Sequence, residues 1–93
     1  MPQVQYSPKA EADLAGILRY TLEQWGAAQT SRYLDRLVDT FDLLAHHPEM
    51  GRTYFVGRLN WRRFEIASHV ILYRPIHDGI KLQRISHKRQ LNP

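Results

Sequence analysis

The side chains that could act on an anionic partner gather in the last third of the chain. They are Arg62, Arg63, Tyr73, Arg74, Arg84, His87, Lys88 and Arg89. Cleavage of a phosphodiester needs a base, an acid and a cation that stabilises the charged transition state. Tyr73 and His87 could supply the base and the acid, and Arg74 or Arg84 the cation. In the alternative interpretation Tyr73 is a core aromatic and His87 a structural residue at a strand end.

The charge of the chain is divided unevenly between its two halves. Residues 1–46 carry four Lys and Arg against six Asp and Glu, a net charge of −2, whereas residues 47–93 carry nine against three, a net charge of +6. Such a basic half is typical of proteins that meet nucleic acid, a phosphate-bearing ligand or an acidic protein segment. A solvated face without a partner would give the same distribution, so both interpretations stay open.

Arg62 allows two interpretations. In an extended segment it shares its face with Phe64 and Ile66, and a guanidinium on a buried face needs a partner. It could therefore bind an anion. It could equally be solvated at the start of the strand, or paired with Glu65, Asp78 or an acidic residue of a helix.

The sequence predicts neither a metal nor a cofactor. His46 and His47 are adjacent at the end of an expected helix, so their rings point in different directions, and no Asp or Cys accompanies them at ligand spacing. The chain contains no cysteine, and no Gly-rich phosphate loop or nucleophile elbow occurs in it.

Length and composition indicate a single globular domain, residues 1–93. The chain is 43% hydrophobic and 24% charged, which is enough apolar surface for one small core. No apolar run suggests a membrane span, and the N-terminus lacks a signal-peptide pattern. Together with the lack of cysteine, this suits a cytoplasmic protein.

Two amphipathic helices are predicted in the first half. Ser7 is an N-cap with Pro8 at the first helical position, apolar residues recur at helical spacing as far as Trp25, and Gly26 ends the helix. A second helix is expected over residues 28–45. Because few residues separate the two, they should form an antiparallel hairpin.

Four short strands are predicted around these helices, over residues 3–6, 61–66, 69–75 and 80–87. Asp78 and Gly79 predict a two-residue hairpin turn between the last two strands, and residues 48–59 are expected to form a loop. In the last strand Ile80 and Leu82 match in parity but Ile85 does not, and a bulge near Gln83 and Arg84 would reconcile them. The predicted fold class is α+β, in the order β-α-α-β-β-β, with the helical hairpin packed on a small, mostly antiparallel twisted sheet.

Five segments of the chain together resemble the RelE/ParE superfamily of toxins from bacterial type II toxin–antitoxin modules. They are residues 6–14, 47–52, 61–62, 69–74 and 84–87, and in order and spacing they extend over nearly the whole chain. The resemblance implies the superfamily's β-α-α-β-β-β fold, which agrees with the order derived from the residues themselves.

The resemblance implies one of two activities. RelE-like members cut messenger RNA on the ribosome, with lysines and arginines of the sheet and a tyrosine near the C-terminus, whereas ParE-like members bind DNA gyrase and trap it on broken DNA. Here Arg62 and Arg63 stand in place of lysines, and no tyrosine follows Tyr73. The ending from Arg84 to His87 is similar to the Arg-x-x-His ending of ParE. The resemblance therefore favours a gyrase inhibitor that is not itself an enzyme.

Two alternatives remain beside the gyrase inhibitor. One is a ribosome-dependent mRNA endoribonuclease with Tyr73, Arg84 and His87 as its catalytic residues. The other is an inactive toxin-fold binding module.

The resemblance also implies a partner. A cognate antitoxin, encoded by the adjacent gene and of the ribbon-helix-helix type, would lay an amphipathic segment along the helical hairpin and the sheet and form a hetero-oligomer with the toxin. The residues expected to contact the gyrase target or the antitoxin are Arg62, Arg74, Arg84, His87, Lys88 and Arg89.

Overall fold

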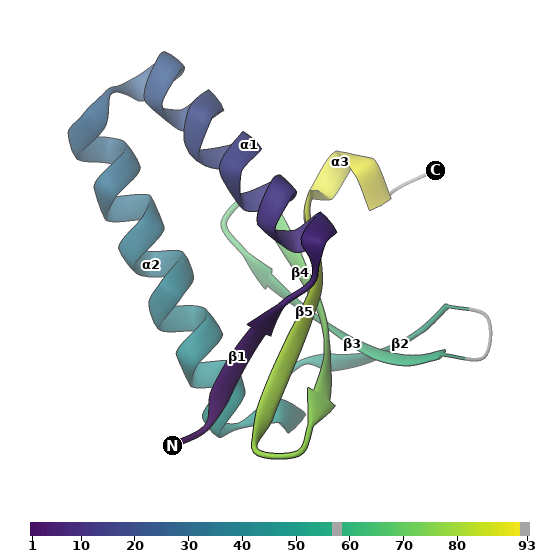
Figure 1. The fold of residues 1–93 in the computed structure, drawn as a ribbon. Helices are drawn as coiled ribbons and strands as arrows, with labels where there is room; N and C mark the ends of the chain where they lie inside the picture. Colours follow the sequence, from purple (N-terminus) through teal and green to yellow (C-terminus); the bar gives the residue numbers. More distant parts are fainter. Residues whose placement is uncertain (57–58, 92–93) are drawn as a thin grey trace.

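The computed structural model describes residues 1–56 and 59–91 and consists of a helical hairpin on one face of a five-stranded sheet (Figure 1). The elements in chain order are β1 (Gln3–Tyr6), α1 (Pro8–Trp25), α2 (Ala27–His46), a 3₁₀ helix η1 (Pro48–Met50), β2 (Arg52–Val56), β3 (Leu59–Ile66), β4 (His69–Ile76), β5 (Gly79–His87) and α3 (Lys88–Leu91). The predicted α+β class and the helical hairpin are confirmed.

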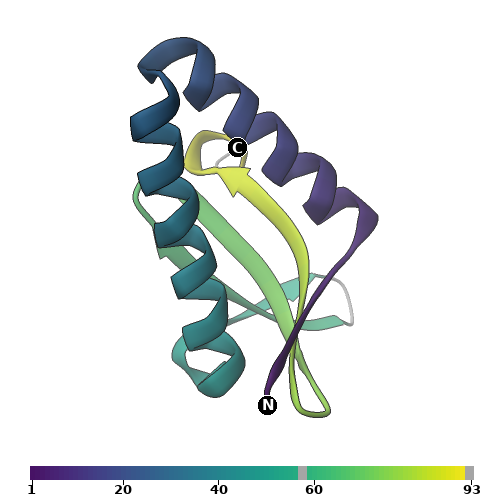
Figure 2. The ribbon, with the colours of Figure 1, turned by 60° about the vertical axis from the view of Figure 1, so that its left-hand side comes forward.

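The sheet has the strand order β1-β5-β4-β3-β2. β1 pairs with β5 in parallel, and the other neighbours are antiparallel. In the rotated view both long helices lie on the same side of the sheet (Figure 2). The opposite side, which we call the open face, carries neither α1 nor α2. No helix among the described residues has the length and apolar character needed to cross a membrane.

The core lies between the helical hairpin and the sheet. α1 contributes Ala10, α2 contributes a row of apolar residues, and β3, β4 and β5 supply the sheet side. The buried cluster comprises Ala10, Leu37, Phe41, Leu44, Ala45, Ile66, Ile71, Tyr73, Ile80, Leu82 and Ile85. The apolar residues of α2 recur every three or four positions because that spacing places them on one face of a helix.

Two local signals fix the helical hairpin as the sequence predicts. The Ser7 hydroxyl accepts a hydrogen bond of 3.0 Å from the Ala10 N–H, and Pro8 follows at the first helical position. Gly26 has φ of 86° and separates α1 from α2. A side chain is strained at that φ, so glycine allows the chain to reverse there.

The expectation of a loop over residues 48–59 is wrong for residues 52–56. These form β2, which pairs antiparallel with β3 from Arg52 opposite Arg63 to Val56 opposite Leu59. The run Thr53, Tyr54, Phe55 and Val56 has high strand propensity, and this outweighs the glycines that flank it in sequence. Leu59, also expected in the loop, is the first residue of β3, and residues 57 and 58 lie outside the described residues.

The predicted bulge in the last strand is confirmed. Leu72 lies opposite Arg84 and Tyr73 opposite Leu82, so Gln83 is the extra residue of β5. The bulge allows both Leu82 and Ile85 to face the core although they differ in parity.

The hairpin between β4 and β5 is confirmed with its turn shifted by one residue. His77 and Asp78 form the turn, Asp78 has φ of 62°, and Gly79 already pairs with Ile76. A Cβ at Gly79 would overlap the backbone of Gln3, because β1 runs directly beside it. Glycine is therefore needed at the first residue of β5 rather than in the turn.

Candidate functional site

Tyr73 on β4 holds the segment that joins α2 to β2. Its ring is fully buried, and its hydroxyl accepts a hydrogen bond of 2.8 Å from the Gly51 N–H and donates one of 2.7 Å to the Pro48 carbonyl. Burial is the main cause of the raised pKa of Tyr73. A Cβ on Gly51 would overlap the Tyr73 hydroxyl, so this approach requires glycine. Both hydrogen-bonding positions of the hydroxyl are thus used inside the protein.

Arg62 on β3 strengthens the same attachment. It lies opposite Tyr73 in the sheet, and its Nη1 donates to the Gly51 carbonyl at 2.6 Å and to the Glu49 carbonyl at 3.4 Å. The partners of this arginine are therefore backbone carbonyls, whereas the sequence interpretation considered acidic side chains or a bound anion. We refer to Pro48, Gly51, Arg62 and Tyr73 as the η1 clamp.

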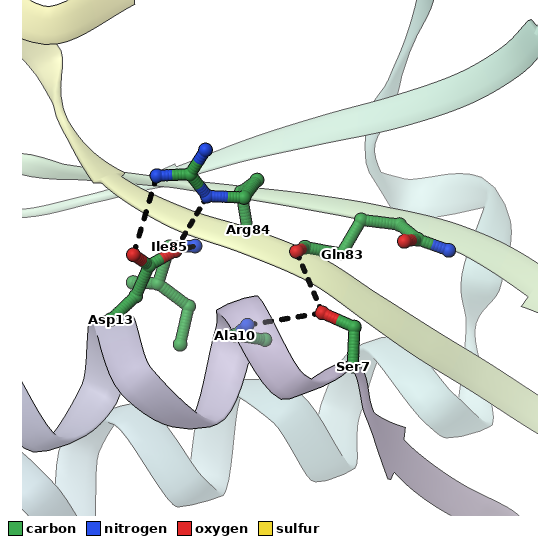
Figure 3. A network of polar contacts seen from close by, with 6 residues as sticks. All are labelled: Ser7, Ala10, Asp13, Gln83, Arg84 and Ile85. Carbon is green, nitrogen blue, oxygen red and sulfur yellow. Dashed lines mark hydrogen bonds and ion pairs between the residues drawn. The ribbon is translucent and has the colours of Figure 1, made fainter.

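Arg84 joins β5 to α1 through Asp13 (Figure 3). Its Nε and Nη2 donate to the two carboxylate oxygens of Asp13 at 2.9 and 3.3 Å, and the Ile85 N–H donates to the same carboxylate at 2.9 Å. The hydrogen bond and the charge of Asp13 raise the pKa of Arg84. Figure 3 also shows Ser7, whose hydroxyl donates to the carbonyl of the bulge residue Gln83 at 2.8 Å.

His87 lies in a groove beneath the helical hairpin. The groove has a volume of about 960 Å³ and is lined by residues of α1, α2, β4, β5 and α3. Among the lining side chains are Ile17, Tyr20, Trp25, Tyr33, His69, Ile85, His87 and Arg89. Tyr20 and Trp25 are largely exposed, at 62% and 70%, so the groove presents aromatic surface to solvent.

Two histidines and a tyrosine form the end of this groove. The His69 and His87 rings meet edge to face with 5.5 Å between centroids, and the Tyr33 hydroxyl lies 2.6 Å from His69 Nδ1. Burial, and then the neighbouring His87, lower the pKa of His69. A neutral His69 with its proton on Nε2 can accept the tyrosine hydrogen bond at Nδ1.

The open face contains a cluster of charges around Glu65. Its carboxylate lies 3.2 Å from Arg63, 3.3 Å from Lys88 and 3.6 Å from Arg52. The hydrogen bond and the charge of Lys88, followed by the charges of Arg63 and Arg52, lower the pKa of Glu65. Three cations of this face, including the predicted contact residue Lys88, therefore share one carboxylate, which offsets only one of their three charges.

The other predicted contact residues are dispersed over the molecule. Arg74 is exposed on the open face, and Arg89 is exposed on α3 beside the groove. His87 lies opposite His69, four residues along β4 from Tyr73, which corresponds to about 13 Å along a strand. Tyr73, Arg84 and His87 therefore occupy three separate places: the η1 clamp, the contact with α1 and the groove.

Sequence reasoning missed the role of Asp13, the three partners of Glu65, which it had considered only as a partner of Arg62, and the pair of Tyr33 and His69. Asp13 was indistinguishable from an acidic residue that favours a helix N-terminus. The partners of Glu65 come from β2, β3 and α3, and Arg52 was placed in a loop. For His69 the sequence contained one signal. It shares a face with Ile71 on the predicted strand, which places this histidine on the side of the core.

Comparison with known proteins shows the family. Residues 4–92 match the model of the ParE toxin of the type II toxin–antitoxin system parDE. The chain is 33% identical over 88 residues to Toxin ParE1 of Caulobacter vibrioides, with 95% of this chain and 91% of that protein covered. It is 34% identical over 84 residues to Toxin ParE1 of Mycobacterium tuberculosis, with coverages of 89% and 86%.

A solved structure shows the same fold. It is described as the chromosomal ParDE toxin–antitoxin system from P. aeruginosa, and it superposes with a TM-score of 0.74 over 94% of this chain and 96% of that chain at 19% identity. The family match over nearly the whole chain, and relatives above 30% identity along most of their length, establish that this chain belongs to the ParE toxin family of type II toxin–antitoxin systems.

Proposed function

We propose that this chain is a single-domain toxin that inhibits DNA gyrase and is neutralised by a cognate antitoxin. The observation that carries the proposal is the dispersal of Tyr73, Arg84 and His87. A ribonuclease of the RelE type would need its acid, base and cation around one phosphate. In this family member those groups serve other contacts, which favours a protein that acts by binding over one that acts by catalysis.

The proposed contacts with the target are the cationic residues that extend to solvent. Arg74 and Arg89 are exposed, and Lys88 shares its charge with Glu65. Arg62 and Arg84 donate to internal partners, so in a complex they would use the N–H groups that these bonds leave over. His87 lines the groove, so a partner that enters the groove can contact it. Because the proposed target is cytoplasmic, we place the toxin there too.

A supercoiling assay tests the gyrase proposal. Purified toxin is titrated into gyrase, ATP and relaxed plasmid, and both supercoiled product and cleaved plasmid are quantified on gels. We expect loss of supercoiling together with accumulation of cleaved plasmid. Arg74→Gln should weaken inhibition about tenfold or more, as expected when a charged contact of an interface is lost. Arg19→Gln is the matched control, because it removes the same charge from the exposed surface of α1.

Normal supercoiling at saturating wild-type toxin would refute the gyrase proposal. Cleavage of translated messages at defined codon positions, tested in parallel in a cell-free translation reaction, would support the RelE-like alternative instead. A chain without effect in either reaction, and harmless when expressed alone, would be a binding module.

We infer that the antitoxin segment occupies the groove beneath the helical hairpin. Support comes from its volume of about 960 Å³ and its exposed aromatic side chains, which suit the apolar face of an amphipathic segment. Arg89 at its margin suits an acidic residue on the polar side of that segment. We expect the partner to be encoded by the adjacent gene, to carry a ribbon-helix-helix domain, and to form a hetero-oligomer with this chain.

A further inference from the structure

One side chain from each strand forms a row across the open face. Tyr54 of β2 lies opposite Trp61 of β3, and Lys81 of β5 lies opposite both Arg74 of β4 and Gln5 of β1. Arg62 opposite Tyr73 is the last pair of the β3–β4 ladder, and Trp61 and Arg74 each lie one residue beyond it on the open face. We call Tyr54, Trp61, Arg74, Lys81 and Gln5 the cross-strand row.

The row points away from the helices. Tyr73, Ile80 and Leu82, the sequence neighbours of Arg74 and Lys81, belong to the buried cluster under the helical hairpin. Because side chains alternate along a strand, Arg74 and Lys81 extend on the other face. Five strands at a spacing of about 4.8 Å make the row about 19 Å long. Its members are all exposed or half-buried, so a partner can reach them.

The charges of the row differ from those of the Glu65 cluster. Arg52, Arg63 and Lys88 share the Glu65 carboxylate. Within residues 1–56 and 59–91, by contrast, no carboxylate lies within ion-pair distance of Arg74 or Lys81. Two cations therefore lie side by side on neighbouring strands with their charge available to an anionic partner.

Aromatic rings lie at the other end of the row. Trp61 offers a half-buried indole, and the Arg63 guanidinium lies over the Tyr54 ring at 5.5 Å from the ring centroid. Aromatic rings beside cations on an open surface are the combination by which proteins bind single strands, with bases stacked on rings and phosphates on cations. In a duplex the base faces are already stacked, and the acidic side chains of a protein segment carry no ring that could stack on Trp61.

We propose that the cross-strand row binds single-stranded nucleic acid, with a base stacked on Trp61 and phosphates on Arg74 and Lys81. This inference does not depend on the gyrase proposal, because it concerns direct binding by the toxin alone. A chain that inhibits gyrase but fails the tests below would refute this inference and leave the other intact.

Fluorescence anisotropy with labelled oligonucleotides of about ten nucleotides, within the site sizes of single-strand-binding folds, tests the proposal. Oligothymidylate and oligouridylate are compared with a duplex of equal length. We expect tighter binding of the single strands, DNA or RNA. Trp61→Ala should weaken it at least about fivefold, as expected for loss of one stacked base. The double variant Arg74→Gln/Lys81→Gln should lower the slope of log K against log salt by about 1.4, or 0.7 for each phosphate.

A second readout avoids truncation of Trp61. In a Trp25→Phe background, Trp61 is the only remaining tryptophan, and stacking of a base should quench its fluorescence on addition of oligothymidylate. Trp25 is 70% exposed on the other side of the sheet, so this background should fold normally. Arg19→Gln, on α1, should bind single strands like the wild-type chain.

Three results would overturn the proposal. The first is equal affinity of the wild-type and Trp61→Ala chains for oligothymidylate combined with absence of quenching. The second is a loss of affinity for oligothymidylate in Arg19→Gln as large as that in Arg74→Gln/Lys81→Gln, which would indicate unspecific attraction by net charge. The third is binding of an oligoglutamate peptide but of no oligonucleotide, which would assign the row to an acidic protein.

Discussion

At the scale of single residues, the polar groups that attract attention in the sequence are largely committed to internal contacts. The Tyr73 hydroxyl satisfies the Gly51 N–H and the Pro48 carbonyl, and Arg62 satisfies the Gly51 carbonyl. Buried backbone groups that the hydrogen bonds of helices and strands leave unpaired need such partners. The η1 clamp therefore explains why a tyrosine and an arginine face each other on the helix-covered side of the sheet.

Replacement of Tyr73 by phenylalanine tests the η1 clamp. The ring and its packing stay, but the buried Gly51 N–H and Pro48 carbonyl lose their partner, so we expect a loss of about 1–3 kcal/mol in the free energy of unfolding. Urea denaturation followed by circular dichroism measures it. The control is Tyr20→Phe, whose hydroxyl is on a largely exposed residue. An equally stable Tyr73→Phe chain would show that solvent satisfies both backbone groups.

The identity of these residues could be predicted from the sequence only in part. Parity placed Arg62 on the face of Phe64, which predicts a partner for its guanidinium but does not say which. Its actual partners are the main-chain carbonyls of Glu49 and Gly51. Every residue has a main-chain carbonyl, so the residue types do not indicate such partners. The same limit applies to the Tyr73 hydroxyl, because neither the catalytic nor the core interpretation of Tyr73 specifies its backbone partners.

At the scale of elements, α1 is attached to β5 by polar contacts at its N-terminal half. Ser7 accepts from the Ala10 N–H and donates to the bulge carbonyl of Gln83, and Asp13 binds Arg84 and the Ile85 N–H (Figure 3). β1 pairs with β5 only as far as Tyr6 opposite Leu82. Beyond that point, Ser7 and Asp13 supply the hydrogen-bond partners along this edge of β5.

Replacement of Asp13 by alanine should weaken this attachment. The Ile85 N–H and the Arg84 guanidinium lose a shared acceptor, and we expect about 1–3 kcal/mol of destabilisation. Hydrogen exchange gives the more specific readout, because the Ile85 amide should lose protection before amides of the β3–β4 ladder do. Asp39→Ala, on the exposed side of α2, is the control. Unchanged exchange at Ile85 would contradict a role for Asp13 in holding β5.

The contact of α2 with β4 through His69 should depend on pH. The folded-state pKa of His69 is lowered by burial and by His87, so the unfolded chain binds more protons below the ordinary histidine pKa of about 6.5. Stability is therefore expected to rise with pH through this window and to be lost as pH falls from about 6.5 toward the lowered value. Protonation also forces Nδ1 to donate toward the Tyr33 hydroxyl, which must then turn its own proton elsewhere.

Melting temperatures measured between pH 7 and pH 5 test this dependence. The wild-type chain should lose more thermal stability over that range than His69→Gln, which has no titrating ring at position 69. His77→Gln, in the exposed turn between β4 and β5, is the control for removal of a histidine that lies outside this contact. Parallel profiles for wild type and His69→Gln would show that His69 does not titrate differently in the two states.

Elements were more predictable than their connections. The caps at Ser7 and Gly26, and the parity conflict that required a bulge at Gln83, are local signals, and each appears in the structure as expected. β2 was missed because its neighbouring glycines suggested a loop, whereas its pairing with β3 is a tertiary contact. Strand propensity decides such cases only when a partner edge is available, and the sequence does not show the edge of β3.

At the scale of the whole molecule, the two sides of the sheet offer different surfaces. The groove between the helical hairpin and the end of the sheet presents Tyr20, Trp25 and Tyr33, while the open face presents Arg74 and Lys81. The first is suited to an amphipathic segment and the second to an anion. Since Arg74 and the groove lie on opposite sides of the sheet, mutations of Arg74 and of the groove should affect toxicity and neutralisation separately.

Expression of the toxin with and without the protein of the adjacent gene tests this separation. Tyr20→Asp places a charge in the groove at a residue that is 62% exposed, so the chain should fold and stay toxic but escape neutralisation. Arg74→Gln should lose toxicity and still co-purify with the antitoxin. Arg19→Gln, next to Tyr20 and outside the groove lining, should behave as wild type in both respects. If Tyr20→Asp were neutralised normally, or if Arg74→Gln lost the antitoxin together with its toxicity, one surface would serve both partners.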